Sequence, residues 1–259
     1  MKPAYLIDLD GTLYAGDRAI PNAAEFIRYL QQNDRSYLLV TNCPSRTAAQ
    51  VVEKLVGFSI IVPESVVLTS GMVAAMYLRE QGMLRAFLLG GEAVRQELES
   101  RGIDIVQENA DCVLVAWDRN FTYEKLDIAA QQVRQGATLV CTNPDKVIPG
   151  TCGPVPHSGS LCAAVESACG ENAVMLGKPG AQMARYALAI VGVEPQDAIV
   201  VGDLQETDMR FANYNGMRGA LVLTGLTSRE DISSKDPPSF VFDNLSCLMA
   251  FDKEIYSYR

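Results

Sequence analysis

Residues 5–14 read Tyr5-Leu6-Ile7-Asp8-Leu9-Asp10-Gly11-Thr12-Leu13-Tyr14, an apolar run that ends in two aspartates. A run this apolar predicts a strand buried within a parallel sheet. Because side chains alternate along a strand, Asp8 and Asp10 are expected on the same side of the sheet, with Leu9 turned away. Carboxylates at the edge of a buried strand are costly unless a cation or hydrogen bonds receive them. This segment therefore predicts a metal-assisted site at the end of the first strand.

The composition is that of a globular protein with an acidic surface. The chain has 259 residues, of which 48% are hydrophobic, enough for one large domain or two smaller ones. Its net charge of −9 and its pI near 4.7 argue against a nucleic acid polymer or an anionic membrane as a partner. An acidic protein still binds an anionic substrate when a metal ion and a few local cations reverse the field in its pocket.

The sequence also favours a cytoplasmic location. No stretch approaches the roughly 20 apolar residues that span a bilayer. The first predicted strand begins almost at Met1, which leaves no room for a signal peptide. The seven cysteines are scattered and form no CxxC pair, as expected of reduced thiols in the cytoplasm rather than of disulfides or a zinc site.

Apolar runs alternate with amphipathic segments along the chain, which predicts an α/β fold with a parallel sheet. The alternation repeats on a smaller scale in the middle of the chain. We therefore expect one domain interrupted by another, with residues 1–80 and 178–259 forming the core and 81–177 forming the insert. Within the insert, a long loop is expected to run from Thr142 to about Gly159, and the tail from Ser228 onward is expected to be rich in loops.

Several predicted strands end in polar residues at their carboxyl ends, namely Asp8 and Asp10, Thr41-Asn42, and Asp203. In an open parallel sheet, ligands bind outside these ends, where the topology switches, so the residues should converge. Asp208 would join them from the first turn of the next helix, and Lys178 is the natural cation for the cluster. A set of carboxylate oxygens suits Mg²⁺, and a lysine with hydroxyl donors suits a phosphoryl group.

Four segments together resemble the ordered motifs of the haloacid dehalogenase (HAD) superfamily: Asp8 to Tyr14, Thr41-Asn42, Gly177-Lys178-Pro179, and Gly202-Asp203 with Thr207-Asp208. The resemblance spans the whole chain and implies a Rossmann-like HAD core with an inserted α/β cap of the C2 type. The insert, with Thr142-Asn143-Pro144-Asp145, is similar to the cap of the NagD-like and 4-nitrophenylphosphatase-like branch.

The resemblance also implies roles for individual residues. Asp8 would be the nucleophile that forms an aspartyl phosphate, and Asp10 would be the general acid and base. Mg²⁺ would be held by Asp8, the Asp10 main-chain carbonyl and Asp203, with Asp208 helping directly or through water. Substrate binding would fall to Gly11, Thr41, the Asn42 amide, Asp145 and Lys178.

The resemblance implies a phosphatase for small phosphorylated metabolites, and a nucleoside monophosphate such as UMP is the favoured substrate. Phosphoglycolate, pyridoxal phosphate and sugar phosphates are alternatives, as are phosphoryl transfer to an acceptor other than water and a catalytically silent binding protein. A homodimer through the cap is a family-level expectation.

Structural explanations compete with these roles. Thr41 and Asn42 could cap the helix near Pro44, Asp208 could be a first-turn carboxylate that the helix dipole stabilises, and Lys178 could be a solvated loop residue. His157 is expected to be a loop residue.

Overall fold

A computed structural model describes residues 2–150 and 152–256, which divide into two compact units by their internal contacts. The first unit comprises the described residues of 1–41, 48–68 and 178–259, and the second comprises those of 42–47 and 69–177. Helix α3 (Ser70–Glu80) belongs to the second unit, whereas the predicted boundary after residue 80 put it in the first. The interpretation of the second unit as a cap stays a prediction.

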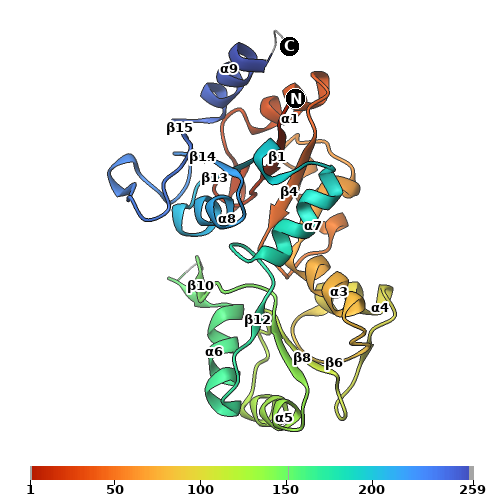
Figure 1. The fold of residues 1–259 in the computed structure, drawn as a ribbon. Helices are drawn as coiled ribbons and strands as arrows, with labels where there is room; N and C mark the ends of the chain where they lie inside the picture. The colour runs from red at the N-terminus through yellow and green to blue at the C-terminus, as the bar shows by residue number, and fades with distance from the viewer. Residues whose placement is uncertain (1, 151, 257–259) are drawn as a thin grey trace. The chain divides into compact units, whose positions relative to one another are not determined.

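Six strands of the described chain form the sheet of the first unit, in the order β15-β14-β13-β1-β4-β5. The pairs from β15 through to β4 are parallel. From β1 the chain runs outward on one side to β4, and it returns on the other side at β13, so the topology switches beside β1 (Figure 1). The strands are β1 (Ala4–Ile7), β4 (Tyr37–Thr41), β5 (Val67–Thr69), β13 (Ala198–Gly202), β14 (Arg218–Val222) and β15 (Phe240–Phe242).

Helices cover this sheet because each has one apolar side. In α1 (Ala23–Gln32), for example, Phe26, Ile27 and Leu30 are buried at helical spacing. Helix α7 packs on β4, and α8 packs on β13 and β14. The other elements of the unit are α2 (Ala48–Val56), α7 (Ala181–Val191), α8 (Arg210–Tyr214), α9 (Leu245–Tyr256), the 3-10 helices η1 (Glu64–Val66), η2 (Pro195–Asp197) and η4 (Arg229–Asp231), the π-helical turn η3 (Gln205–Met209), and the hairpin of β2 (Tyr14–Ala15) with β3 (Arg18–Ala19).

Helix α9 corrects the prediction of a tail rich in loops. It packs against α1 and β15, and its Asp252 is completely buried. The Asp252 carboxylate accepts hydrogen bonds from the Tyr5 and Tyr29 hydroxyls and from the Arg35 guanidinium, whose Nη2 lies 2.7 Å away. A buried charge on the inner face of a helix interrupts its apolar spacing, so the periodicity that indicates a helix was weak here.

The second unit contains a smaller sheet in the order β12-β9-β8-β6-β7, with parallel pairing throughout. Helices α5 and α6 pack on this sheet. The hydrophobic core between them contains Phe87, Val113 and Leu139 from the strands and Val133 and Val165 from the two helices. The fold is therefore α/β in both units, as predicted. The remaining bounds are β6 (Arg85–Leu89), α4 (Glu92–Ser100), β7 (Asp104–Ile105), β8 (Cys112–Val115), α5 (Tyr123–Arg134), β9 (Thr138–Cys141), β10 (Val147–Ile148), β11 (Val155–Pro156), α6 (Ser158–Cys169) and β12 (Val174–Met175).

The predicted long loop is more ordered than expected. Strands β10 and β11 pair in antiparallel fashion within it, and α6 begins at Ser158. Gly159 explains why that helix was missed, since a glycine at a helix start weakens its signal. A Cβ at Gly159 would lie 2.2 Å from the Pro144 carbonyl oxygen, and the Gly159 N–H donates to the Asp145 carbonyl oxygen over 2.9 Å. Glycine therefore lets the Asn-Pro-Asp turn lie directly on the helix.

Two further observations concern membrane-spanning helices and disulfides. Among the described residues, no helix combines the length and the apolar character that crossing a membrane requires. The seven cysteines are free thiols. The cytoplasmic location stays a prediction.

Candidate active site

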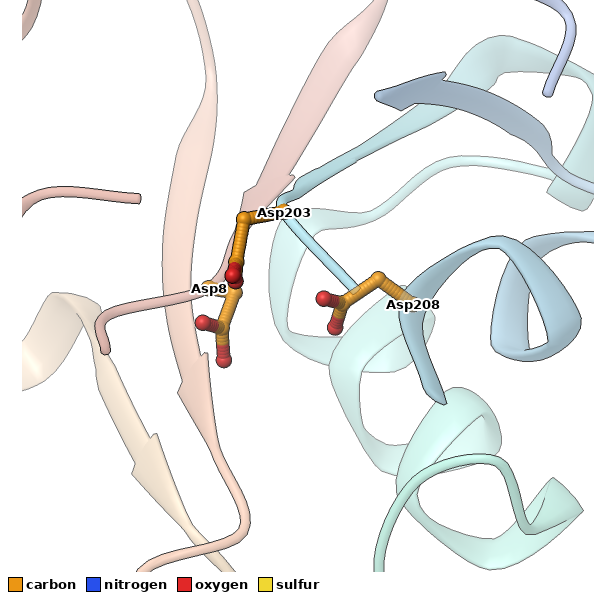
Figure 2. Close-up of side chains that lie close together, drawn as sticks. All are labelled: Asp8, Asp203 and Asp208. Carbon is orange, nitrogen blue, oxygen red and sulfur yellow. The ribbon is translucent and has the colours of Figure 1, made fainter. Parts of the chain in front are cut away.

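Three carboxylates come together at the edge of the first sheet, and one oxygen atom of each lies within 4.8 Å of those of the other two (Figure 2). Asp8 follows β1 and Asp203 follows β13, and the register that pairs Ile7 with Val201 brings them out side by side. Asp208 reaches the same point from η3, a π-helical turn, rather than from the first turn of an α-helix as predicted. Its approach needs Gly202, because a Cβ there would lie 2.2 Å from the Asp208 carboxyl carbon.

Lys178 lies against this acidic cluster, and it is 2% exposed. Its Nζ is 2.5 Å from Asp8 Oδ1 and 2.7 Å from Asp208 Oδ1. Charge-assisted hydrogen bonds of this length hold a lysine in one place, unlike a solvated loop residue. The structure therefore brings together Asp8, Lys178, Asp203 and Asp208, as the sequence predicted.

The electrostatics of the cluster are unfavourable for so many negative charges. Burial raises the pKa of Asp8 well above its usual value, and the charge of Lys178 offsets this only in part while Asp208 and Asp203 add to it. Burial and the charge of Asp208 raise the pKa of Asp203 to about 6. Burial would lower the pKa of Lys178, but the charges of Asp208 and Asp8 raise it. Such shifts are typical of functional sites that receive a cation.

Asp10 lies outside this cluster of three acids. Strand β1 ends at Ile7, so strand alternation does not extend to Asp10, which is exposed. Its Oδ2 accepts a hydrogen bond of 3.2 Å from the Tyr14 hydroxyl. Its predicted roles as general acid and as a main-chain metal ligand stay predictions.

Gly11 and Thr41 occupy the same edge of the sheet. Gly11 has a φ of +85°, and a Cβ there would lie 2.3 Å from Asp203 Oδ2. Its N–H donates to the Tyr14 carbonyl oxygen over 2.7 Å. Thr41 is the buried last residue of β4. Position 11 requires glycine because of its positive φ and because a side chain would clash with Asp203. Substrate binding by Gly11 or Thr41 stays a prediction.

Asn42 and Asp145 form a pair within the second unit. The Asn42 Nδ2 lies 3.1 and 3.3 Å from the two carboxylate oxygens of Asp145. The Asn42 carbonyl oxygen accepts hydrogen bonds from Ser70 Oγ over 2.7 Å and from Asn143 Nδ2 over 2.9 Å. The Asn-Pro-Asp turn is thus attached to the segment that follows Thr41. Binding of substrate by this pair stays a prediction.

His157 differs from the expected loop residue. It occupies the N-cap position of α6 and is buried, and burial lowers its pKa to about 4. Its ring lies 5.3 Å from the Trp117 ring, and its Nδ1 lies 3.3 Å from Asn143 Oδ1. A neutral imidazole in this place supports the Asn-Pro-Asp turn.

The loop after β14 was missed as part of the site. Its Leu226 N–H donates to Asp203 Oδ2 over 2.8 Å, and its Thr224 hydroxyl donates to the Gly11 carbonyl oxygen over 2.8 Å. Gln205 anchors the same loop, because its side-chain amide donates to the Ser233 carbonyl oxygen. One signal was available in the sequence: Thr224-Gly225 follows the apolar run Ala220-Leu221-Val222-Leu223, which indicates a strand, so these two residues are also expected at the carboxyl edge of the sheet.

Substituting Gly225 by alanine is expected to disturb the Asp203 carboxylate and to weaken divalent-metal binding by the acidic cluster about 10- to 100-fold, the usual cost of a change in a group that orients a metal ligand. A Cβ at this position would lie 1.9 Å from Asp203 Oδ2, so the carboxylate or the loop must move. The measurement is a titration of each protein with a divalent metal ion such as Mg²⁺, which gives its metal affinity. Gly91→Ala is a matched control, because a Cβ there would lie 3.8 Å from the nearest atom, the Trp117 carbonyl oxygen. Equal metal affinity of Gly225→Ala and the unmodified protein would contradict the prediction.

Comparison with known proteins identifies the class. Residues 5–104 match a family of haloacid dehalogenase-like hydrolases, and residues 175–248 match a HAD-hydrolase-like family. The chain belongs to the HAD superfamily, in its NagD-like branch. Hydrolases of this family generally use a divalent metal ion, and the cluster of Asp8, Asp203 and Asp208 offers ligands for one.

Individual relatives define the chemistry further. The chain is 38% identical over 244 residues to the 5'-nucleotidase YutF of Bacillus subtilis, a match covering 93% of this chain and 95% of YutF. It is also 38% identical over 250 residues to the acid sugar phosphatase of Staphylococcus epidermidis, covering 95% of this chain and 96% of that protein. The solved structure of NagD from E. coli K-12 matches with a TM-score of 0.90 and 32% identity, covering 95% and 98% of the two chains. The protein is a phosphatase, a hydrolase of phosphoric monoesters.

Proposed function

We propose that this phosphatase depends on Mg²⁺ and acts through an aspartyl phosphate on Asp8. The observation that carries the proposal is the grouping of Asp8, Asp203 and Asp208 around Lys178 at the switch point of the sheet. A carboxylate nucleophile, a cation and an oxygen-rich metal site are the parts that phosphoryl transfer to an enzyme requires.

The residues present fit a magnesium ion. The three acids offer only oxygen atoms, which Mg²⁺ prefers, and one oxygen from each lies within 4.8 Å of those of the other two. When ionised, the three acids carry three negative charges against the single positive charge of Lys178. A divalent ion would balance the remaining two. Asp8, Asp203 and Asp208 would hold it, and when bound it would reduce the repulsion between the nucleophile and the phosphate.

In the first step, the Asp8 carboxylate attacks phosphorus and the ester oxygen leaves. The bond between phosphorus and the leaving oxygen breaks as the bond to Asp8 forms, and Asp10 donates its proton to that oxygen. Lys178 supports the step, because its ammonium group beside Asp8 can also hold a phosphoryl oxygen. Thr41 and the Asn42 amide are proposed to bind further phosphoryl oxygens.

In the second step, water attacks the phosphorus of the aspartyl phosphate. Asp10, which has lost its proton, takes one from that water, and inorganic phosphate leaves as the Asp8 carboxylate is restored. The enzyme thus returns to its starting protonation state after one turnover.

We infer that the substrates are small phosphorylated metabolites and favour nucleoside monophosphates such as UMP. One relative is named a 5'-nucleotidase, which supports this choice. Another, with the same 38% identity, is named an acid sugar phosphatase, so sugar phosphates are the first alternative. Phosphoglycolate, pyridoxal phosphate and phosphoryl transfer to another acceptor remain further alternatives. Asp145 is proposed to contact the substrate, and a homodimer through the second unit is proposed from the family alone.

The test is a phosphate-release assay over a panel of UMP, a sugar phosphate, phosphoglycolate and pyridoxal phosphate, with and without Mg²⁺. We expect release without an added acceptor, an absolute need for the metal, and the highest kcat/KM for UMP. Release that persists after thorough chelation would refute the metal requirement. A flat profile over the panel would refute a dedicated substrate, and a requirement for an acceptor alcohol would identify a phosphotransferase.

A further inference from the structure

We infer that Tyr14 is a positioning residue that orients the Asp10 carboxyl group for proton transfer to the leaving oxygen. The inference rests on the proposed role of Asp10 as general acid. It goes beyond that role because it assigns a function to a side chain that has no part in the reaction steps described above.

The backbone sets Tyr14 one turn away from Asp10. The Gly11 N–H donates to the Tyr14 carbonyl oxygen over 2.7 Å, and the Tyr14 N–H donates to the Leu9 carbonyl oxygen over 3.2 Å. Asp10 and Tyr14 also form an isolated β-bridge. The distance between the two residues is therefore fixed by a closed turn and does not depend on a flexible loop.

The tyrosine ring is held as firmly as its backbone. It is 2% exposed and lies 5.5 Å from the Phe58 ring. Lys54 of α2 places its Nζ 3.8 Å from the centre of the same ring. A cation over the ring draws electron density from the phenol and makes its hydroxyl a stronger hydrogen-bond donor. The exposed Asp10 carboxylate thus has a partner whose ring is buried and packed on two sides.

This contact distinguishes the two oxygens of Asp10. The Tyr14 hydroxyl donates to Oδ2 over 3.2 Å, a length that commonly shortens when a substrate is bound. When Asp10 carries its proton, Oδ2 accepts from Tyr14, so the proton occupies Oδ1. Tyr14 therefore selects the oxygen from which the proton is donated and limits rotation of the carboxyl group. Without the hydroxyl, only a fraction of molecules would hold the proton in the productive direction.

The effect should depend on the leaving group, because a basic leaving oxygen needs its proton more than an acidic one does. The test compares phenyl phosphate with 4-nitrophenyl phosphate, which differ little in size, and measures kcat/KM, which covers the steps through departure of the leaving group. For Tyr14→Phe we expect kcat/KM to fall about tenfold with phenyl phosphate and at most about twofold with 4-nitrophenyl phosphate, a part of the 10²- to 10⁴-fold effect of a general acid.

Three further variants control the experiment. Tyr29→Phe removes a different hydrogen bond from a tyrosine to an aspartate in the same unit, that between Tyr29 and the buried Asp252, and should leave the ratio between the two substrates unchanged. Lys54→Met keeps the Tyr14 hydroxyl and should shift the ratio in the same direction by about twofold. Asp10→Asn should shift it more than Tyr14→Phe does. Thermal unfolding of each variant establishes that it is folded.

The outcomes separate this inference from the proposed function. A selective loss with phenyl phosphate in both Asp10→Asn and Tyr14→Phe supports it. If Asp10→Asn loses activity selectively with phenyl phosphate but Tyr14→Phe does not, the inference is overturned and the proposed function stays in place. This holds whether Tyr14→Phe keeps its activity or loses it equally with both substrates. Absence of selectivity in Asp10→Asn overturns the role of Asp10 and the inference with it.

Discussion

Asp8→Asn is expected to reduce phosphate release at least about 10³-fold, since an amide cannot act as the nucleophile. The loss should be similar for every phosphate ester, because in the proposed mechanism each ester transfers its phosphoryl group to this same carboxylate. The measurement is single-turnover phosphate release with Mg²⁺ present. Asp34→Asn is a suitable control, because Asp34 is exposed and its left-handed backbone (φ 50°) suits asparagine well.

The same substitution should leave the folded state intact or make it more stable. In the absence of metal, Asp8 lies beside Asp203 and Asp208, and burial with these neighbouring charges raises its pKa. A neutral amide of the same shape removes that repulsion, and Lys178 keeps its ion pair of 2.7 Å with Asp208. Thermal unfolding in the presence of a chelator checks this. An inactive variant that has also unfolded would say nothing of the nucleophile, whereas a folded variant with more than about a tenth of the activity would contradict the assignment.

The cluster could be predicted because its members follow a rule that local sequence carries. Asp8 and Asp203 stand directly after apolar runs, and parallel strands place their carboxyl ends at one edge. Asp208 was expected there because it stands five residues after Asp203, and Lys178 because it follows a short apolar run and precedes a proline. The α/β fold was confirmed for the same reason, since alternating runs of apolar residues and helical periods specify it locally.

Features that depend on distant contacts could not be predicted in this way. The Leu226 N–H that holds Asp203 is a main-chain donor, which every residue except proline offers, so the sequence does not mark it. Helix α9 is held by Asp252, whose partner Tyr5 stands 247 positions away. The exposed position of Asp10 depends on where β1 ends, and element ends are the least certain part of a sequence-based prediction.

Lys178→Met is expected to lower both activity and stability. Methionine approximates the apolar stem of lysine but leaves Asp8, Asp203 and Asp208 without the cation that two of them contact. Breaking a buried ion pair on one side costs about 3–5 kcal/mol, so the metal-free variant should unfold at a clearly lower urea concentration near pH 7.5. Lys125→Met is the matched control, because Lys125 pairs with Asp118 over 2.6 Å but is 37% exposed, and such a pair contributes less than about 1 kcal/mol.

The destabilisation by Lys178→Met should depend on pH in a definite direction. Burial raises the pKa of Asp203 from 3.8 to about 6, so between these values the folded chain binds a proton that the unfolded chain has released, and stability falls as the pH rises. Removing Lys178, whose charge lowers this pKa, extends the fall to higher pH. The difference in unfolding free energy between the two proteins should therefore be large near pH 7.5 and shrink near pH 5. Urea titrations in a chelator at both values measure it. If the difference in unfolding free energy stays constant with pH, methionine destabilises the protein by poor packing. Protonation at low pH can remove the repulsion between uncompensated carboxylates, but it cannot correct a packing defect.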